Sequence, residues 1–271
     1  MKHIGTVFVY VFLLLLLVLS LLPFYLVLIN STYSSIDIVT KLKFLPGTMF
    51  GANYQKLQEL TNIWRGFGNS LIVSVPFVVF SCYFGAFAGY GFAKFQFKGK
   101  TFFFFLVLAS MMLPSQLSII GFYTTSLKLG MLNTYWPLIL PGIANASAVF
   151  FLRGMIEQSV PESLLEAARM EGCSELTIFN RFVLPCIMPG VATIGIFNFV
   201  SSWNNYLGPL IILSDAKKFT MPILIATIKG IFLSNYGAMY VAIAISIFPV
   251  VIVYCFLSRY IINGLTIGAE K

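Results

Sequence analysis

The sequence predicts an all-α, polytopic membrane protein with six transmembrane helices. Of its 271 residues, 59% are hydrophobic and only 10% carry a charge, and the mean hydropathy is +0.91. A soluble domain is about 45–50% apolar and about 25% charged, so this chain lacks the polar side chains to cover its apolar surface. The composition excludes a soluble enzyme, a disordered chain and a fibrous repeat. The sparse excess of positive charge suits a membrane face better than nucleic acid.

Six long runs lack Asp, Glu, Lys and Arg, and each can cross a bilayer once, because about 20 helical residues span its apolar core. These runs cover residues 4–36, 66–93, 101–127, 129–152, 182–214 and 230–258. None alternates with the period of two that is typical of an outer-membrane barrel. We expect one domain over residues 1–271, with spans at about 8–29, 69–91, 102–126, 135–152, 187–212 and 240–260 and a charged loop at 153–185.

The first run follows Lys2 and His3 as a signal peptide would. It is longer than an apolar signal region of about 7–15 residues and lacks a small-x-small cleavage pattern, which predicts an uncleaved anchor. An even number of spans puts both termini on one side. The short loop with Lys94, Lys98 and Lys100 favours a cytoplasmic N-terminus, whereas the basic residues of the first outer loop oppose it.

The six charge-free runs contain no ionisable Asp, Glu, Lys, Arg or His side chain, since the only histidine of the chain is His3. This excludes an intramembrane proton relay, a zinc-protease motif and Ser/His or Cys/His catalysis. Gly99-Lys100-Thr101 resembles the end of a phosphate-binding loop, but Lys94 stands where that loop needs a glycine. The four cysteines form no CxxC pair, so we expect no metal site. Any energy source must therefore lie on another protein.

Uncharged polar and aromatic side chains near the end of the fifth run are candidates for a solute path. Amide groups can hydrogen-bond a neutral, hydroxyl-rich solute, and an aromatic ring can pack on the C–H bonds of a sugar. The candidates are Asn198, Trp203, Asn204 and Asn205. The alternative for each is an interfacial aromatic residue or a hydrogen bond between helices.

The charged segment at 153–185 predicts a short helix–turn–helix on the membrane surface. Residues 159–162 (SVPE) fit a capping box that opens a helix over 162–171. Gly172 suits the positive φ of a helix end, and Ser174 suits the cap of a second helix to about residue 183. Pro185 is expected to stop that helix before the next span. An interfacial amphipathic hairpin without a docking role is the alternative.

This segment contains a long, spaced pattern: Glu166-Ala167-Ala168, three residues, Gly172, nine residues, Phe182, one residue, then Leu184-Pro185. The pattern resembles the EAA loop of ABC importer permeases. Residues 129–136 (LGMLNTYW), 202–205 (SWNN) and 264–269 (GLTIGA) extend the resemblance over nearly the whole chain. These segments are similar to the smaller permease of maltose-type and multiple-sugar importers. Glu171, Cys173 and Phe182 depart from that branch in residue type but keep charge or approximate size.

The resemblance implies a type I ABC importer permease fold, and a chain that forms half of a translocation path for an oligosaccharide or other carbohydrate. The implied partners are a second, homologous permease, two ATPase subunits, an extracytoplasmic sugar-binding protein and membrane lipid. ATP and Mg²⁺ would bind to the ATPase, so this chain is expected to carry no cofactor and not to be an enzyme. The implied location is the bacterial cytoplasmic membrane, with both termini and the 153–185 loop in the cytoplasm. The implied ATPase-coupling residues are Glu166, Ala167, Ala168, Arg169, Glu171 and Gly172.

A stand-alone secondary transporter of a neutral polar solute is the competing class. It would need intramembrane ionisable groups or a ring of pore-lining polar residues, and neither appears in the sequence. A membrane-embedded hydrolase would need a histidine or metal site in the spans. Co-purification distinguishes these classes, because a lone transporter is stable by itself and a permease subunit comes with its partners.

Overall fold

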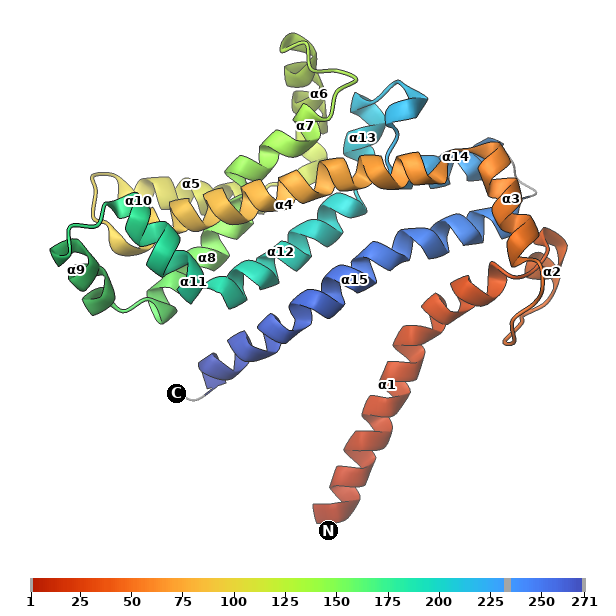
Figure 1. Cartoon of the computed structure of the whole chain (residues 1–271), viewed down its shortest axis with the longest axis horizontal. Helices are drawn as coiled ribbons and strands as arrows, with labels where there is room; N and C mark the ends of the chain where they lie inside the picture. The colour runs from red at the N-terminus through yellow and green to blue at the C-terminus, as the bar shows by residue number, and fades with distance from the viewer. Residues whose placement is uncertain (1, 232–234, 270–271) are drawn as a thin grey trace. The chain divides into compact units, whose positions relative to one another are not determined.

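The computed structural model describes residues 2–231 and 235–269, and every regular element within them is helical (Figure 1). The chain divides into two compact units. Unit 1 comprises Met1–Arg65 and Ile223–Phe248, and unit 2 comprises Gly66–Pro222 and Pro249–Lys271.

Unit 1 begins with α1, an apolar helix whose side chains from Val7 to Leu19 are almost all exposed, as expected of a helix that faces lipid or another subunit. Helix α3 contacts the end of α1, where the Asn53 amide donates to the carbonyls of Ser31 (2.8 Å) and Tyr33 (2.9 Å). Apart from the first three residues of α4, the helices wholly or partly in this unit are α1 (Lys2–Asn30), α2 (Ser35–Thr40), α3 (Phe50–Leu60), α14 (Met221–Ile231) and α15 (Tyr236–Ala269).

Unit 2 holds the long helix α4 (Ile63–Lys94) and most of the shorter elements. These are α5 (Lys100–Met112), η1 (Ser115–Ser118), α6 (Ile119–Lys128), α7 (Trp136–Ile139), η2 (Leu140–Ala144), α8 (Ala146–Ser159), α9 (Glu162–Met170), α10 (Glu175–Ile178), η3 (Phe179–Val183), α11 (Leu184–Cys186), α12 (Met188–Trp203), α13 (Leu207–Ile212) and η4 (Ala216–Lys218).

Small residues on α4 let α8 approach its backbone closely. A Cβ atom added at Gly85 would lie 2.6 Å from the Cβ of Ala148, and one added at Gly89 would lie 2.9 Å from the backbone nitrogen of Arg153. Close packing over small residues is how helices associate in a membrane, where the hydrophobic effect contributes little. Helix α12 lies beside both of them (Figure 1), and the Cys82 thiol on α4 contacts its backbone. The three helices form the core that carries the sites described below.

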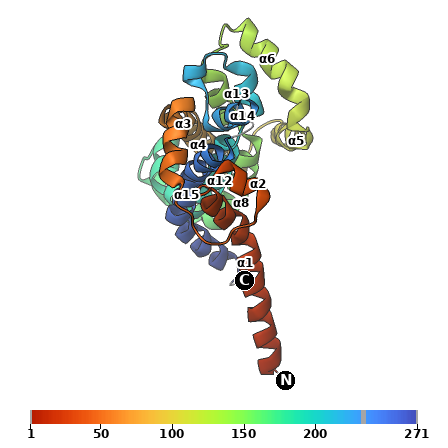
Figure 2. The ribbon, with the colours of Figure 1, turned by 90° about the vertical axis from the view of Figure 1, so that its right-hand side faces the viewer.

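Four helical stretches in the described residues are long and apolar enough to cross a membrane, and two bent helix pairs raise the number to six. The four stretches are Thr6–Asn30, Ile63–Lys94, Trp136–Ser159 and Tyr236–Leu257. The bent pairs are Lys100–Met112 with Gln116–Lys128, at 94°, and Glu175–Cys186 with Met188–Trp203, at 79°. Figure 2 shows α5 and α6 meeting at the first of these bends.

The bends interrupt two segments for which the sequence predicts unbroken helices. Within 102–126 the helix stops at Met112, because Pro114 lacks an N–H donor and forces Leu113 into an extended conformation. Within 187–212 the chain leaves the helix after Trp203 and re-enters one at Leu207. Helix α8 in turn continues to Ser159, beyond the expected end at residue 152.

Candidate functional site

The segment after α8 forms the predicted hairpin, and α9 spans Glu162–Met170, one residue shorter than predicted. The predicted capping box is wrong. Ser159 still belongs to α8, so its hydroxyl cannot reach the start of α9, and the N-cap position is held by Pro161, which has no side-chain acceptor. Helix α9 therefore begins without a side-chain cap.

Gly172 ends α9 as predicted, with a φ of 76°. The N–H of Cys173 donates to the carbonyl of Ala168 (3.1 Å) and that of Gly172 to the carbonyl of Arg169 (2.9 Å). These two bonds define a Schellman motif, which needs a left-handed residue at this position and so favours glycine.

Ser174 caps α10 as predicted, since its hydroxyl accepts from the N–H of Thr177 (3.4 Å). The expectation that Pro185 stops the second helix is wrong. The chain makes one π-helical turn, Phe179–Val183, and remains helical through Cys186, and the sharp bend follows at Ile187. A widened turn tolerates proline because it displaces the carbonyl with which the ring would otherwise clash.

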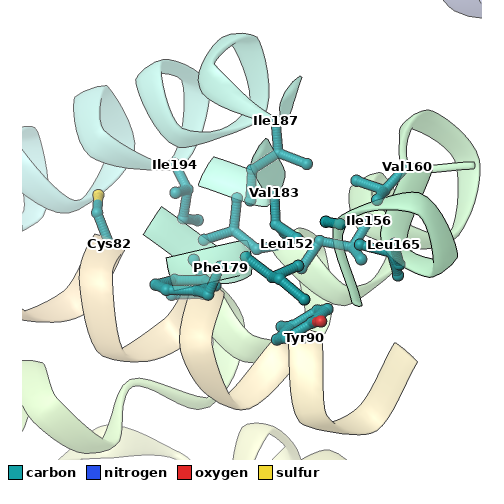
Figure 3. Close-up of a cluster of buried hydrophobic side chains, with 14 residues drawn as sticks. Cys82, Tyr90, Leu152, Ile156, Val160, Leu165, Phe179, Val183, Ile187 and Ile194 are labelled. Carbon is teal, nitrogen blue, oxygen red and sulfur yellow. The ribbon is translucent and has the colours of Figure 1, made fainter. Parts of the chain in front are cut away.

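Helix α9 has one buried and one exposed face. Leu165 (0% exposed) and Ala168 pack into a cluster with Phe179 and with Ile156 of α8 (Figure 3). The opposite face is open, and Met170 is 88% exposed. Of the six predicted coupling residues, Ala168 lies in the core of the hairpin. The other five are exposed, namely Glu166, Ala167, Arg169, Glu171 and Gly172.

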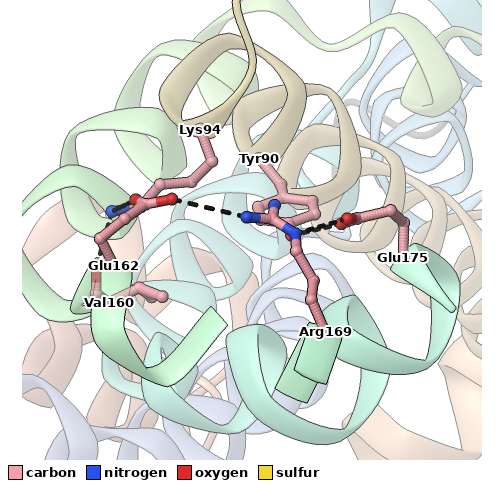
Figure 4. Close-up of polar contacts among 6 residues, drawn as sticks. All are labelled: Tyr90, Lys94, Val160, Glu162, Arg169 and Glu175. Carbon is pink, nitrogen blue, oxygen red and sulfur yellow. Dashed lines mark hydrogen bonds and ion pairs between the residues drawn. The ribbon is translucent and has the colours of Figure 1, made fainter. Parts of the chain in front are cut away.

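Two polar contacts tie the hairpin to the end of α4 (Figure 4). In the first, Glu175 accepts from the Arg169 Nε (2.8 Å) and from the Tyr90 hydroxyl (2.9 Å). The hydrogen bond from the Arg169 guanidinium lowers the pKa of the Glu175 carboxyl. Because Arg169 is on α9 and Glu175 on α10, this contact closes the hairpin as well as anchoring it.

In the second contact, the Lys94 ammonium donates to the carbonyl of Val160 (2.6 Å) and lies 3.4 Å from the Glu162 carboxylate. The lysine is almost buried, so this interaction is screened less than a surface ion pair. Neither Tyr90 nor Lys94 is a candidate from sequence, because no local spacing links them to partners more than 60 residues away.

A cleft of about 540 Å³ lies elsewhere in unit 2, between η1 and α6 on one side and the end of α12 with the segment after it on the other. Its polar lining comes from Gln116, Ser118, Ser201, Asn204, Asn205 and Tyr206. Pockets of about 300–1,000 Å³ accommodate small ligands. The Asn205 side-chain oxygen accepts from the N–H of Gly208 (3.2 Å), which fixes the orientation of its amide.

The structure divides the four candidate path residues into two pairs. Asn204 and Asn205 line the cleft. Trp203 is buried and stacks on Phe199 with ring centroids 5.6 Å apart. Asn198 is also buried, and it donates to the Ser81 hydroxyl at 2.6 Å.

Residues 81–266 match the profile of a family described as the binding-protein-dependent transport system inner membrane component. The chain belongs to this family. It is thus a membrane-embedded ABC importer permease, a transport component rather than an enzyme, and the predicted resemblance is confirmed.

Named relatives of this permease span nearly its full length. The arabinooligosaccharides transport system permease protein AraQ of Halalkalibacterium halodurans is 38% identical over 231 residues, which cover 85% of this chain and 82% of the relative. The melibiose/raffinose/stachyose import permease protein MelC of Bacillus subtilis is 30% identical, with 92% and 91% covered.

The fold matches a chain in the crystal structure of a bacterial ABC transporter involved in the import of the acidic polysaccharide alginate. The TM-score is 0.82 at 24% identity, and the match covers 96% of this permease and 97% of that chain. The predicted all-α fold of an ABC importer permease is confirmed.

Proposed function

We propose that this permease forms half of the translocation path of an ATP-driven importer for a neutral oligosaccharide. The proposal rests on the hairpin of this importer-family chain. Its inner face is hydrogen-bonded to α4, and the outer face of α9 is exposed. An element of this kind can transmit a force only if it is held rigidly at its base, and the Schellman turn and the Lys94 and Tyr90 contacts supply that rigidity.

In the proposed topology the chain crosses the membrane six times. Helices α1 and α4, the stretch Trp136–Ser159 and α15 are single spans, the bent pair of α5 and α6 is the third span, and α12 with α13 is the fifth. Both termini and the hairpin then lie in the cytoplasm, where an ATPase can reach α9. The cleft, near the other end of α12, would lie deeper along the path.

The partners in this proposal are a second, homologous permease, two ATPase subunits that bind ATP and Mg²⁺, and an extracytoplasmic binding protein. Glu166, Ala167, Glu171 and Gly172 are the residues we expect to contact the ATPase. Arg169 and Ala168 would act by holding the hairpin in shape. ATP binding can bias the permeases only if the two transport conformations differ in their free energy of docking to the ATPase.

The cargo in this proposal is a neutral carbohydrate, because the cleft offers amides and hydroxyls and no charged side chain in its lining. Relatives named for arabinooligosaccharide and for melibiose, raffinose and stachyose transport support this class. Asn204 and Asn205 are the groups we expect to meet sugar hydroxyls. Asn198 and Trp203 would support the wall of the path from behind.

The test is uptake by proteoliposomes that contain this chain with the second permease and the ATPase, in the presence of the binding protein. We expect accumulation of a labelled oligosaccharide such as arabinotriose or raffinose that depends on ATP and on every component. The chain reconstituted alone should accumulate nothing. Accumulation against a gradient by the lone chain would refute the proposal and favour a secondary transporter.

A matched pair of variants tests the docking surface. Glu166→Ala removes an exposed carboxylate on α9, and Glu59→Ala removes an exposed carboxylate on α3. We expect the first to reduce co-purification of the ATPase and the second to leave it unchanged. Equal ATPase recovery with both variants would contradict the assignment of α9 as the docking helix.

A further inference from the structure

A second, smaller cavity of about 60 Å³ adjoins the cleft in unit 2. Phe77, Leu138, Ser201 and Asn205 line both hollows, so these residues form part of the wall between them. No charged side chain contributes to the lining of the small cavity. This lining suits a neutral group.

Two hydroxyl groups in this lining, those of Ser74 and Thr220, have no hydrogen-bond partner within the part of the chain that the structure describes. The two residues are 1% and 4% exposed. A hydroxyl offers one donor and two acceptor sites, and buried hydroxyls in folded proteins are almost always bonded. Two such groups at one cavity indicate a hydroxyl-bearing ligand.

The position of Thr220 is fixed on both sides. The Asn69 amide on α4 donates to the carbonyls of Lys217 and Phe219, both at 2.9 Å, and the hydroxyl of Ser70 accepts from the N–H of Met221 at 2.8 Å. Thr220 is the residue between these contacts. Ser74 is one helical turn beyond Ser70 on α4, so these two serines lie on the same face of the helix and both line the cavity.

The volume limits what the cavity can take. At about 60 Å³, it has about one-ninth of the volume of the adjoining cleft of about 540 Å³. We therefore expect a sugar ring to remain in the cleft and a small group, such as water or one hydroxymethyl group, to enter the cavity.

We propose that the cavity lined by Ser74 and Thr220 is a subsite for one hydroxyl group, which the transported solute supplies from the cleft and which water replaces in its absence. The solute part of this inference rests on the proposed function. The subsite adds specificity at a point that the substrate ring does not reach, because a site built to bind a hydroxyl disfavours an analogue that lacks it.

The first test is independent of the solute and measures the thermal midpoint of the purified importer complex. Thr220→Val replaces the hydroxyl with a methyl group of similar size. Thr193→Val is the matched control, because the Thr193 hydroxyl bonds to the Pro189 carbonyl of its own helix (2.9 Å). We expect both variants to lower the midpoint, by about 2–4 °C. If Thr220→Val raises the midpoint while Thr193→Val lowers it, the hydroxyl binds nothing and the subsite is refuted.

The second test distinguishes a solute hydroxyl from water. Uptake of arabinotriose and of its monodeoxy analogues is compared between the wild-type complex and a complex with S74A and T220V, using the same binding protein. We expect the wild type to transport one analogue about tenfold more slowly than arabinotriose, and the double variant to transport both at similar rates. If the double variant still transports the analogue more slowly than arabinotriose, the claim that a solute hydroxyl enters the subsite is refuted and water is the ligand.

If the wild-type complex takes up none of these sugars, the proposed cargo is wrong. The thermal test still decides whether the cavity binds a hydroxyl group.

Discussion

Replacing Gly172 with valine tests whether the turn after α9 couples the hairpin to transport. The residue has a φ of 76°, and a Cβ atom built on it would meet nothing within 4 Å. The cost is therefore confined to the backbone, where a non-glycine residue in the left-handed region loses roughly 1–2 kcal/mol. This corresponds to a roughly 5- to 30-fold shift in the equilibrium constant against the native turn and is small beside a total stability of roughly 5–15 kcal/mol.

We expect the Gly172→Val chain to assemble with its partners at the wild-type yield while oligosaccharide uptake and sugar-stimulated ATP hydrolysis fall by up to roughly 30-fold. The assay uses the whole complex in proteoliposomes, with co-purification as the measure of assembly. Gly172→Asn is the matched control, because asparagine tolerates this backbone conformation and should retain most of the activity. Wild-type uptake and ATP hydrolysis by the valine variant would refute the role of the turn.

Three further predictions concern the same hairpin. Leu165→Ala should cost about 2–5 kcal/mol of stability, because the side chain is fully buried, and it should lower the thermal midpoint. Glu166→Ala on the same helix should shift stability by less than about 0.5 kcal/mol. Tyr90→Phe should weaken the hairpin by about 1 kcal/mol, since it removes one hydrogen bond to a half-exposed carboxylate; protease protection of the 153–185 segment measures this. The lowered pKa of Glu175 stabilises the fold above the ordinary carboxyl range, and this contribution disappears as pH falls through the folded value. The thermal midpoints of the wild type and Glu175→Gln should therefore differ at pH 7 and converge in acid.

The sequence predicts the local structure of the hairpin well where the determinants are themselves local. Gly172 and Ser174 adopt the predicted turn and cap, because each acts on backbone groups within a few residues. The capping box at Ser159 fails because packing extends α8 by a further turn, and a helix end set by tertiary contacts leaves no signal in the spacing. Pro185 fails for a similar reason, because a π turn ahead of it absorbs the clash.

Charge patterns identify apolar segments but do not show where they bend. Several apolar runs contain prolines, and the sequence does not show that a helix breaks at Pro114 in particular. The break after Trp203 has no proline at its centre. Likewise, Asn198 and Asn205 are the same residue type and cannot be distinguished by sequence. The packing of α12 against α4 makes Asn198 a buried hydrogen-bond partner of Ser81, whereas Asn205 forms part of the cleft wall.

The 32 residues of α4 have a consequence beyond their role in the core. Near one end Asn69 and Ser70 hold the segment beside the small cavity, and near the other Tyr90 and Lys94 hold the hairpin. At about 1.5 Å per residue, the 24 steps from Ser70 to Lys94 correspond to about 36 Å of one helix, which contains Pro76. In the proposed mechanism, a tilt imposed at the hairpin would reach the cavity end of α4 along this single helix, without a relay of contacts between separate helices.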